Sequence, residues 1–196
     1  MAQRVFDPVG FTCPATLLPK LLLQRTWEKK LGWDQAVEVY IETSFRKWLK
    51  ELHYLNNIRM GRWIYDEATD HTLHTFCDAS KDAYAAVVFL RSIRNGQVTV
   101  KLLAAKSRIA PIRTLTIPRL ELLAAVVGAR LHAMVKRCLE LDVKSFFWSD
   151  SSTVLSWIHR DEEWATFVYN RVVEICSVSA RDEWHYVPGV KNPADL

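Results

Sequence analysis

The sequence predicts an α/β domain preceded by a segment of helices, with the change of pattern near residue 70. Before that residue, apolar side chains recur at helical spacing. After it, short apolar runs alternate with longer amphipathic stretches in the order β-β-β-α-β-α-α-β, which is typical of a sheet flanked by helices. We therefore expect a helical connector over residues 1–70 and an α/β domain over residues 71–196.

The connector is expected to contain two helices. Leucines repeat between Leu17 and Leu22, and a second apolar stripe runs from about Gln35 to Leu55. Residues 32–34 (Gly-Trp-Asp) break the pattern between the two. Because no acid–base constellation occurs in this segment, we interpret it as a connector that packs against something else.

The α/β domain should begin with three strands, over residues 72–78, 83–91 and 97–105. The second is a nearly continuous apolar run, as in a strand that is covered on both faces. Asn95-Gly96 predicts a tight hairpin turn between the second and third strands.

A loop over residues 106–115 and a long helix from about Ile117 to Leu139 are expected next. Thr116 can cap this helix, and an apolar stripe runs along it from Leu120 to Met134. The remaining predicted elements are a strand at 143–149, helices at roughly 151–159 and 165–179, and a last strand at 183–187.

Basic residues are concentrated between residues 101 and 137, although the net charge of the chain is only +4. Glu121 is the only acid in that stretch. A cationic surface that holds one carboxylate suits a polyanionic partner, but a solvated basic helix and loop would show the same composition. The basic residues are Lys101, Lys106, Arg108, Arg113, Arg119, Arg130, Lys136 and Arg137.

The cysteines and the hydropathy indicate an intracellular protein. Cys13, Cys77, Cys138 and Cys176 show no CxxC spacing, so we expect reduced thiols and no zinc knuckle. The N-terminus has no apolar leader, and no run of 18 apolar residues occurs. Neither secretion nor membrane spanning is therefore expected.

Four acids occupy informative positions. Asp78 and Asp150 end predicted strands, Glu121 lies near the start of the long helix, and Asp195 follows the last strand. Strand ends and helix starts are where α/β sheets gather site residues. Each acid alone also fits a cap or turn, but together they predict a carboxylate cluster. Such a cluster repels itself unless cations lie within it, and acids without clustered His or Cys favour Mg²⁺.

Four motifs that contain these acids resemble those of reverse-transcriptase-associated ribonuclease H domains. The upstream stretch Phe6–Phe11 (FDPVGF), together with Ala105–Arg108 (AKSR), resembles BEL/Pao retrotransposon polyproteins in particular. The four motifs are Thr75–Ser80 (TFCDAS), Thr116–Ala124 (TIPRLELLA), Trp148–Thr153 (WSDSST) and Val187–Asp195 (VPGVKNPAD).

The resemblance implies a ribonuclease H-like fold whose five-stranded mixed sheet has three antiparallel strands followed by two parallel ones. It also implies that Asp78, Glu121, Asp150 and Asp195 bind two Mg²⁺ ions, with Mn²⁺ able to substitute. The implied activity is cleavage of the RNA strand of RNA–DNA hybrids. The implied partners are the hybrid, reverse transcriptase and other domains of the polyprotein, in a cytoplasmic virus-like particle or the nucleus. From charge and position alone, we expect Lys106, Arg108 and Arg119 to contact nucleic-acid backbones.

The sequence departs from the family pattern in two respects. Cellular and retroviral relatives carry a histidine in a mobile loop before the last aspartate, whereas residues 189–194 contain none. His185 falls within the predicted last strand. Family members continue into a helix after this aspartate, and this chain ends at Leu196, so we expect a C-terminally truncated domain.

Two alternatives to the nuclease are a peptidase and a module without catalytic activity. A pepsin-like peptidase needs Asp-Thr/Ser-Gly, but Asp78 is followed by Ala-Ser and Asp150 by Ser-Ser. The second is an inactive or truncated module that binds nucleic acid, or docks on reverse transcriptase, without cutting. Metal-dependent cleavage separates this module from the enzyme.

Overall fold

A single mixed sheet organises the domain. The computed structural model describes residues 5–61, 70–113, 115–140 and 143–195. The strands lie in the order β3-β2-β1-β4-β5, with β1, β2 and β3 antiparallel, β4 parallel to β1, and β5 parallel to β4. This arrangement confirms the predicted sheet. The strands are β1 Asp70–Ala79, β2 Ala83–Arg94, β3 Gln97–Ile109, β4 Lys144–Ser149 and β5 Trp184–Tyr186.

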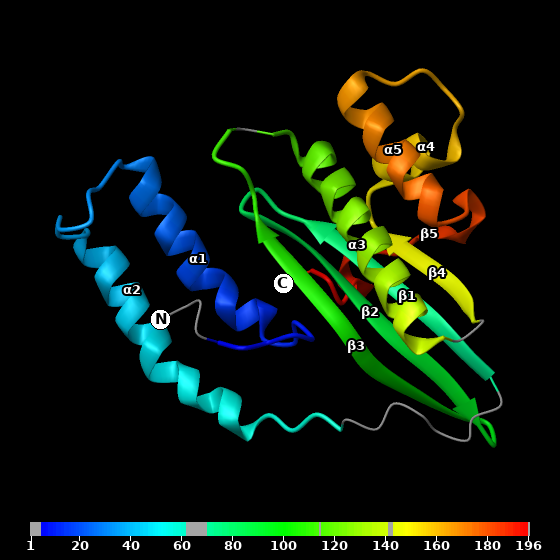
Figure 1. The fold of residues 1–196 in the computed structure, drawn as a ribbon, viewed down its shortest axis with the longest axis horizontal. Coiled ribbons are helices and arrows are strands. Elements are labelled where there is room, and N and C mark those ends of the chain that lie inside the picture. Colours follow the sequence, from blue (N-terminus) through cyan, green and yellow to red (C-terminus); the bar gives the residue numbers. More distant parts are fainter. Residues whose placement is uncertain (1–4, 62–69, 114, 141–142, 196) are drawn as a thin grey trace.

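One long helix, α3 (Ile117–Leu139), packs across β1 and β2 (Figure 1). The helices α4 (Ser152–His159) and α5 (Thr166–Val178) pack against α3 from its other side. Because α3 is covered on two sides, its buried residues extend beyond the predicted stripe and include Leu122. Met134, which was expected in the stripe, is 43% exposed.

The close approach of α3 to the sheet depends on Gly128. A Cβ atom on this residue would lie 2.3 Å from Cys77 Sγ and 3.2 Å from Thr75 Cγ2. Both neighbours belong to β1, which is the central strand. Glycine is therefore required here for packing, not for turning the chain.

A buried histidine connects α3 to the sheet. His132 Nδ1 lies 2.7 Å from Thr75 Oγ1, and its Nε2 lies 2.9 Å from Ser145 Oγ. His132 is only 2% exposed, and burial, with a smaller effect of Lys136, lowers its pKa to about 4. The imidazole is thus neutral near pH 7 and donates from one nitrogen while accepting at the other.

The connector packs against the outer edge of β3. It contains α1 (Cys13–Glu28), α2 (Val39–Glu51) and a 3₁₀ turn (Leu52–Asn57). The amide of Ala105 donates to Val9 O at 2.7 Å, and Gln24 Nε2 donates to Ala110 O at 2.6 Å. Figure 1 shows α1 beside β3, with α2 outside it. The connector therefore covers an edge strand that would otherwise present unpaired backbone groups.

The second connector helix has less apolar contact than its sequence pattern predicted. Only Ile41 and Trp48 are buried in α2, and Trp48 Nε1 donates to Ala15 O of α1 at 2.6 Å. Tyr40 and Leu49, which were expected on the same apolar face, are 42% and 40% exposed. This difference arises because α2 packs mainly against α1.

All four cysteines are free. Among the described residues, no helix is both long and apolar enough to cross a bilayer.

Candidate active site

Asp78 and Asp150 lie at the same end of two neighbouring strands. Cys77 of β1 pairs in register with Ser149 of the parallel strand β4, and each acid is the next residue along its chain. Side chains alternate along a strand, and Cys77 faces α3. Asp78 therefore projects from the opposite face of the sheet.

Glu121 is fixed to the turn that follows Asp150. It lies in the early part of α3, and its Oε2 accepts a hydrogen bond from Ser151 Oγ at 2.5 Å. The same hydroxyl accepts from Val154 N at 3.2 Å and so caps α4. Because Ser151 is buried and directly follows Asp150, its hydroxyl connects the position of Glu121 to that of the second aspartate.

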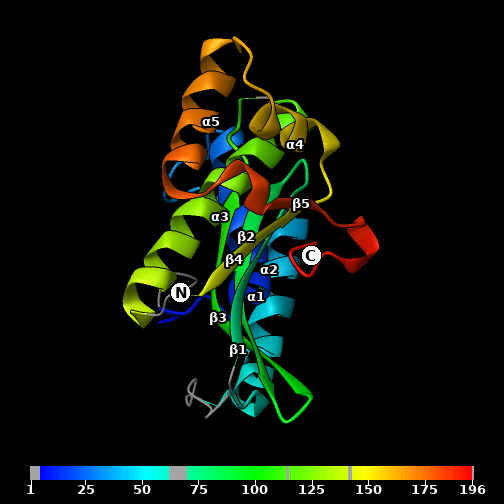
Figure 2. The same cartoon turned by 90° about the vertical axis from the view of Figure 1, so that its right-hand side faces the viewer.

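Asp195 is positioned by a buried asparagine. Asn192 Nδ2 donates to Cys77 O at 3.0 Å, next to Asp78, and Asn192 Oδ1 accepts from Ala194 N at 3.1 Å. The amide of Asp195 donates to Asn192 O at 3.1 Å. Figure 2 shows this C-terminal segment on the side of the sheet opposite α3, which is the side from which Asp78 projects.

The four carboxylates act on one another electrostatically. Burial raises the pKa of Asp78 to about 6, together with repulsion from Asp150, Asp195 and, least, Glu121; the amide of Ala79 opposes this rise. The pKa of Glu121 is also raised, mainly by burial and then by Asp150, while the hydrogen bond from Ser151 lowers it. Asp78 and Glu121 are therefore partly desolvated, and Asp78 experiences the charges of the other three acids.

The donor chemistry of this region fits a hard cation. Asp150 Oδ1 is buried and has no hydrogen-bond partner among the described residues. A Cβ on Gly189 would lie 3.1 Å from Asp150 Oδ2, so the carboxylate lies in a close-fitting cradle. All candidate ligands are carboxylate oxygens, which Mg²⁺ prefers. Within the described ranges, however, no three His, Cys, Asp or Glu side chains converge closely enough to enclose an ion.

The three predicted backbone contacts do not form one patch. Lys106 and Arg108 were expected in a loop, but β3 continues through them because they pair with Ala86 and Tyr84 of β2. Both are exposed and line a groove beside α1. Arg119 lies in the first turn of α3, with its guanidinium carbon 5.1 Å from the ring centre of Phe167.

Two residues that hold the acids were not identified from the sequence. Ser151 occupies a typical N-cap position, and Asn192-Pro193 is a typical turn dipeptide, so local patterns account for both. Their contacts with Glu121 and Cys77 join residues 30 and 115 positions apart, which no local pattern reveals. Thr116, the predicted cap of α3, makes no side-chain capping bond.

A five-stranded sheet in this order, with acids at the ends of β1 and β4 and at the start of α3, defines the ribonuclease H-like class of α/β domains. The chain belongs to the family of Pao retrotransposon-like RNaseH-like domains, whose sequence profile matches residues 1–151. The match therefore includes the connector and the α/β domain as far as Ser151.

Solved structures with low sequence identity resemble the chain. The N-terminal RNase H domain of a Mycobacterium tuberculosis protein, fused to maltose-binding protein, is 12% identical, covering 62% of this chain and 85% of that one with a TM-score of 0.44. RNase H1 from Halobacterium salinarum is 12% identical over 64% and 90%, with a TM-score of 0.41. A foamy viral protease–reverse transcriptase in complex with double-stranded DNA is 14% identical over 100% and 38%, with a TM-score of 0.40. No curated protein sequence matches the chain.

Proposed function

We propose that this domain hydrolyses the RNA strand of RNA–DNA hybrids, in a metal-dependent reaction, during reverse transcription of a retrotransposon. The observation that carries the proposal is the placement of Asp78 and Asp150 at the same end of the neighbouring strands β1 and β4, with Glu121 and the Asp195 segment held there by Ser151 and Asn192. A site that gathers four carboxylates, three of them partly buried, destabilises itself electrostatically unless cations bind there. Membership in the retrotransposon RNaseH-like family supports the same activity.

In this mechanism, Asp78, Glu121, Asp150 and Asp195 would hold two Mg²⁺ ions, for which Mn²⁺ could substitute. When bound there, the ions would supply Lewis-acid activation of water and neutralise charge at the scissile phosphate. A cation and a proton compete for the Asp78 carboxylate, whose pKa burial and the neighbouring acids raise to about 6, so cation binding should weaken as the pH falls through this range. Ser151 keeps Glu121 in place through its hydrogen bond, and Asn192 keeps the Asp195 segment against β1. No histidine in residues 189–194 is available to assist product release.

The proposed partners are the hybrid and the rest of the polyprotein, including reverse transcriptase. Lys106, Arg108 and Arg119 would contact nucleic-acid backbones, and contacts with 2′-hydroxyl groups would select the RNA strand. The connector exposes large apolar side chains such as Trp33 and Val39, at 100% and 79%, which suits docking on a neighbouring domain. An intracellular location, in a virus-like particle or the nucleus, stays a prediction.

The decisive experiment is Mg²⁺-dependent cleavage of a labelled RNA–DNA hybrid by the chain and by Asp150→Asn. Asp34→Asn, which changes an exposed acid of the connector, is the matched control. We expect cutting of only the RNA strand, retained in Asp34→Asn and abolished by EDTA or by Asp150→Asn. Double-stranded RNA and casein should remain intact.

The outcome also decides between the enzyme and the inactive module. Binding of the hybrid without any cutting would identify a binding module. If the chain neither binds nor cuts the hybrid, that result overturns the assignment to nucleic acid.

A further inference from the structure

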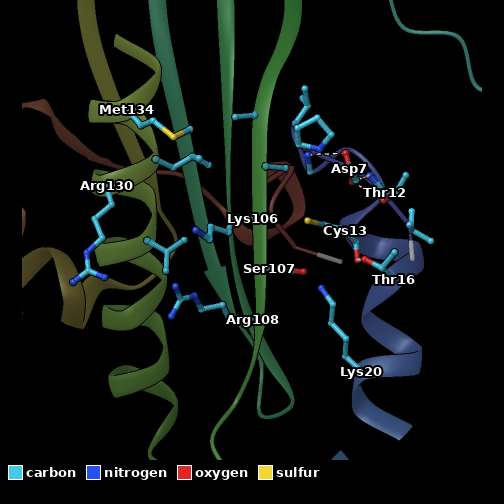
Figure 3. A pocket seen from close by; sticks show the side chains of 18 residues that line it. Asp7, Thr12, Cys13, Thr16, Lys20, Lys106, Ser107, Arg108, Arg130 and Met134 are labelled. Atoms are coloured by element: carbon cyan, nitrogen blue, oxygen red, sulfur yellow. Dashed lines mark hydrogen bonds between the residues drawn. The ribbon is translucent and has the colours of Figure 1, made fainter. Parts of the chain in front are cut away.

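A groove of about 650 Å³ lies between α1 and α3, separate from the carboxylate cluster. Its floor is the stretch of β3 over residues 104–108, and its walls are α3 on one side and α1 with its preceding loop on the other. In Figure 3, Lys20 points from α1 toward Ser107, whereas Lys106 and Arg108 extend from β3 toward α3. Among the described residues, none of the four site acids lines this groove.

The groove is strongly cationic. Lys20, Lys106 and Arg108 have no ion-pair partner within the described parts of the chain. A fourth cation, Arg130, pairs with Glu174 of α5. Three unpaired cations in one concave surface create a positive potential that attracts a polyanion.

The one acid that lines the groove is already engaged in hydrogen bonds. Asp7 Oδ1 accepts from Gly10 N at 2.8 Å, and its Oδ2 accepts from the amide and hydroxyl of Thr12 at 2.7 and 2.5 Å. These bonds fix the loop that leads into α1. The Asp7 carboxylate therefore has little capacity left for binding the basic side chains opposite.

The groove also has an unused hydrogen-bonding group and an apolar side. Ser107 Oγ is buried and has no partner among the described residues, although buried polar atoms are normally paired. Val127, Leu131 and Met134 give the α3 wall an apolar surface. Lys106 and Arg108 extend toward this wall, whereas Lys20 points toward Ser107 from α1 (Figure 3). The groove thus offers cations, a hydroxyl and apolar contacts, which match the phosphates and the sugar–base parts of nucleotides.

We propose that this groove binds the phosphodiester backbone of single-stranded nucleic acid, which makes the connector part of the substrate-binding surface. The inference rests on the proposed function, since it assumes a nucleic-acid substrate at the carboxylates. We expect one strand to enter between the two helical walls and reach the floor, and a duplex to contact less of the groove.

The sheet register connects the groove with the carboxylate cluster. Ser107 pairs with Ala85, and Ala85 pairs with Asp78. Two strand spacings therefore separate Ser107 from Asp78, which is roughly 10 Å at about 4.8 Å each. That distance corresponds to about three nucleotides at roughly 3.4 Å per nucleotide. The groove and the carboxylate cluster therefore lie within the span of a short single-stranded overhang.

The test measures binding of a fluorescent single-stranded oligonucleotide, a blunt hybrid and a hybrid with an overhang, in EDTA and over a range of salt concentrations. The variants are Lys20→Ala and Arg108→Ala, and Lys50→Ala is the matched control because Lys50 is an exposed lysine of α2 outside the groove. We expect Lys20→Ala to bind the single strand about fivefold more weakly. We also expect its slope of log affinity against log salt to fall by about 0.7, as for one lost phosphate contact.

The result overturns the inference if Lys20→Ala and Arg108→Ala both match Lys50→Ala in affinity and salt slope. Displacement of the oligonucleotide by millimolar inorganic phosphate also overturns it, because the groove would then be a small-anion site. Equal losses for the blunt hybrid and the single strand would overturn the single-strand assignment. Failure of the proposed function is recognised by a different result. In that case the wild-type chain would cut no hybrid, whatever the Lys20→Ala variant binds.

Discussion

The carboxylate cluster should make the folded domain less stable than it would be without one of its charges. The pKa of Asp78 is about 6 in the fold and 3.8 in the reference state, so the folded chain holds this proton more tightly than the unfolded chain does. Above about pH 6, ionisation of Asp78 therefore costs more in the folded state. Asp78→Asn removes the charge with little change of size, and we expect the variant to be more stable than wild type in EDTA at about pH 8.

The magnitude follows from the shift. About two pKa units correspond to about 3 kcal/mol of differential interaction if no screening applies. Asp78 is only half-buried, so solvent reduces this figure, and we expect a gain of about 1–2 kcal/mol. Mg²⁺ should relieve the same repulsion in wild type and hence stabilise wild type more than the variant.

Urea unfolding tests this reasoning, with the midpoint and slope compared for wild type, Asp78→Asn and the control Asp34→Asn. We expect the difference between wild type and Asp78→Asn to shrink at about pH 5, where the folded wild-type carboxyl is largely protonated. The reasoning is refuted if Asp78→Asn is no more stable than Asp34→Asn in EDTA, or if Mg²⁺ stabilises both equally.

Three other changes test the packing, the buried histidine and the positioning of Asp195. Gly128→Ala should destabilise the fold by about 1–3 kcal/mol in urea unfolding, because its Cβ would clash with Cys77 Sγ, and an unchanged midpoint would show that α3 can shift. His132 has a pKa of about 4 in the fold and 6.5 in the reference state, so the unfolded chain binds the extra proton and stability should fall as pH falls between these values. This loss of stability is at most about 3 kcal/mol. It is best measured in Asp78→Asn, because protonation of Asp78 stabilises the wild-type fold over the same pH range. If stability did not change with pH in this variant, the buried imidazole would not be neutral. Asn192→Ala should weaken Mg²⁺ binding about tenfold, seen as a smaller shift of the unfolding midpoint with Mg²⁺; equal shifts would exclude a positioning role for Asn192.

The strands were predictable wherever one local feature dominates. The apolar run of β2 and the Asn95-Gly96 turn predicted a hairpin, and both turn residues have positive φ angles of 50° and 78°. The predicted end of β3 was wrong: a loop was expected from residue 106, but the strand continues through Lys106 and Arg108 to Ile109. Their place in the sheet comes from pairing with β2, a tertiary interaction that overrides the local preference of charged residues.

The position of Asp195 and of the connector depends on contacts that the sequence pattern does not contain. Neighbouring parallel strands can be expected to bring Asp78 and Asp150 together, but a residue that follows the last strand can lie anywhere within reach of its loop. The side chain of Asn192 fixes the position of this segment, because it donates a hydrogen bond to Cys77 O, 115 positions earlier in the chain. The connector is comparable: its helices are amphipathic, but only Gly10, with a φ of 84°, allows its loop to approach Ala105 so closely that a Cβ would lie 1.8 Å from the carbonyl oxygen. A local pattern predicts that an apolar face needs a partner, whereas the partner is decided by such single contacts between distant residues.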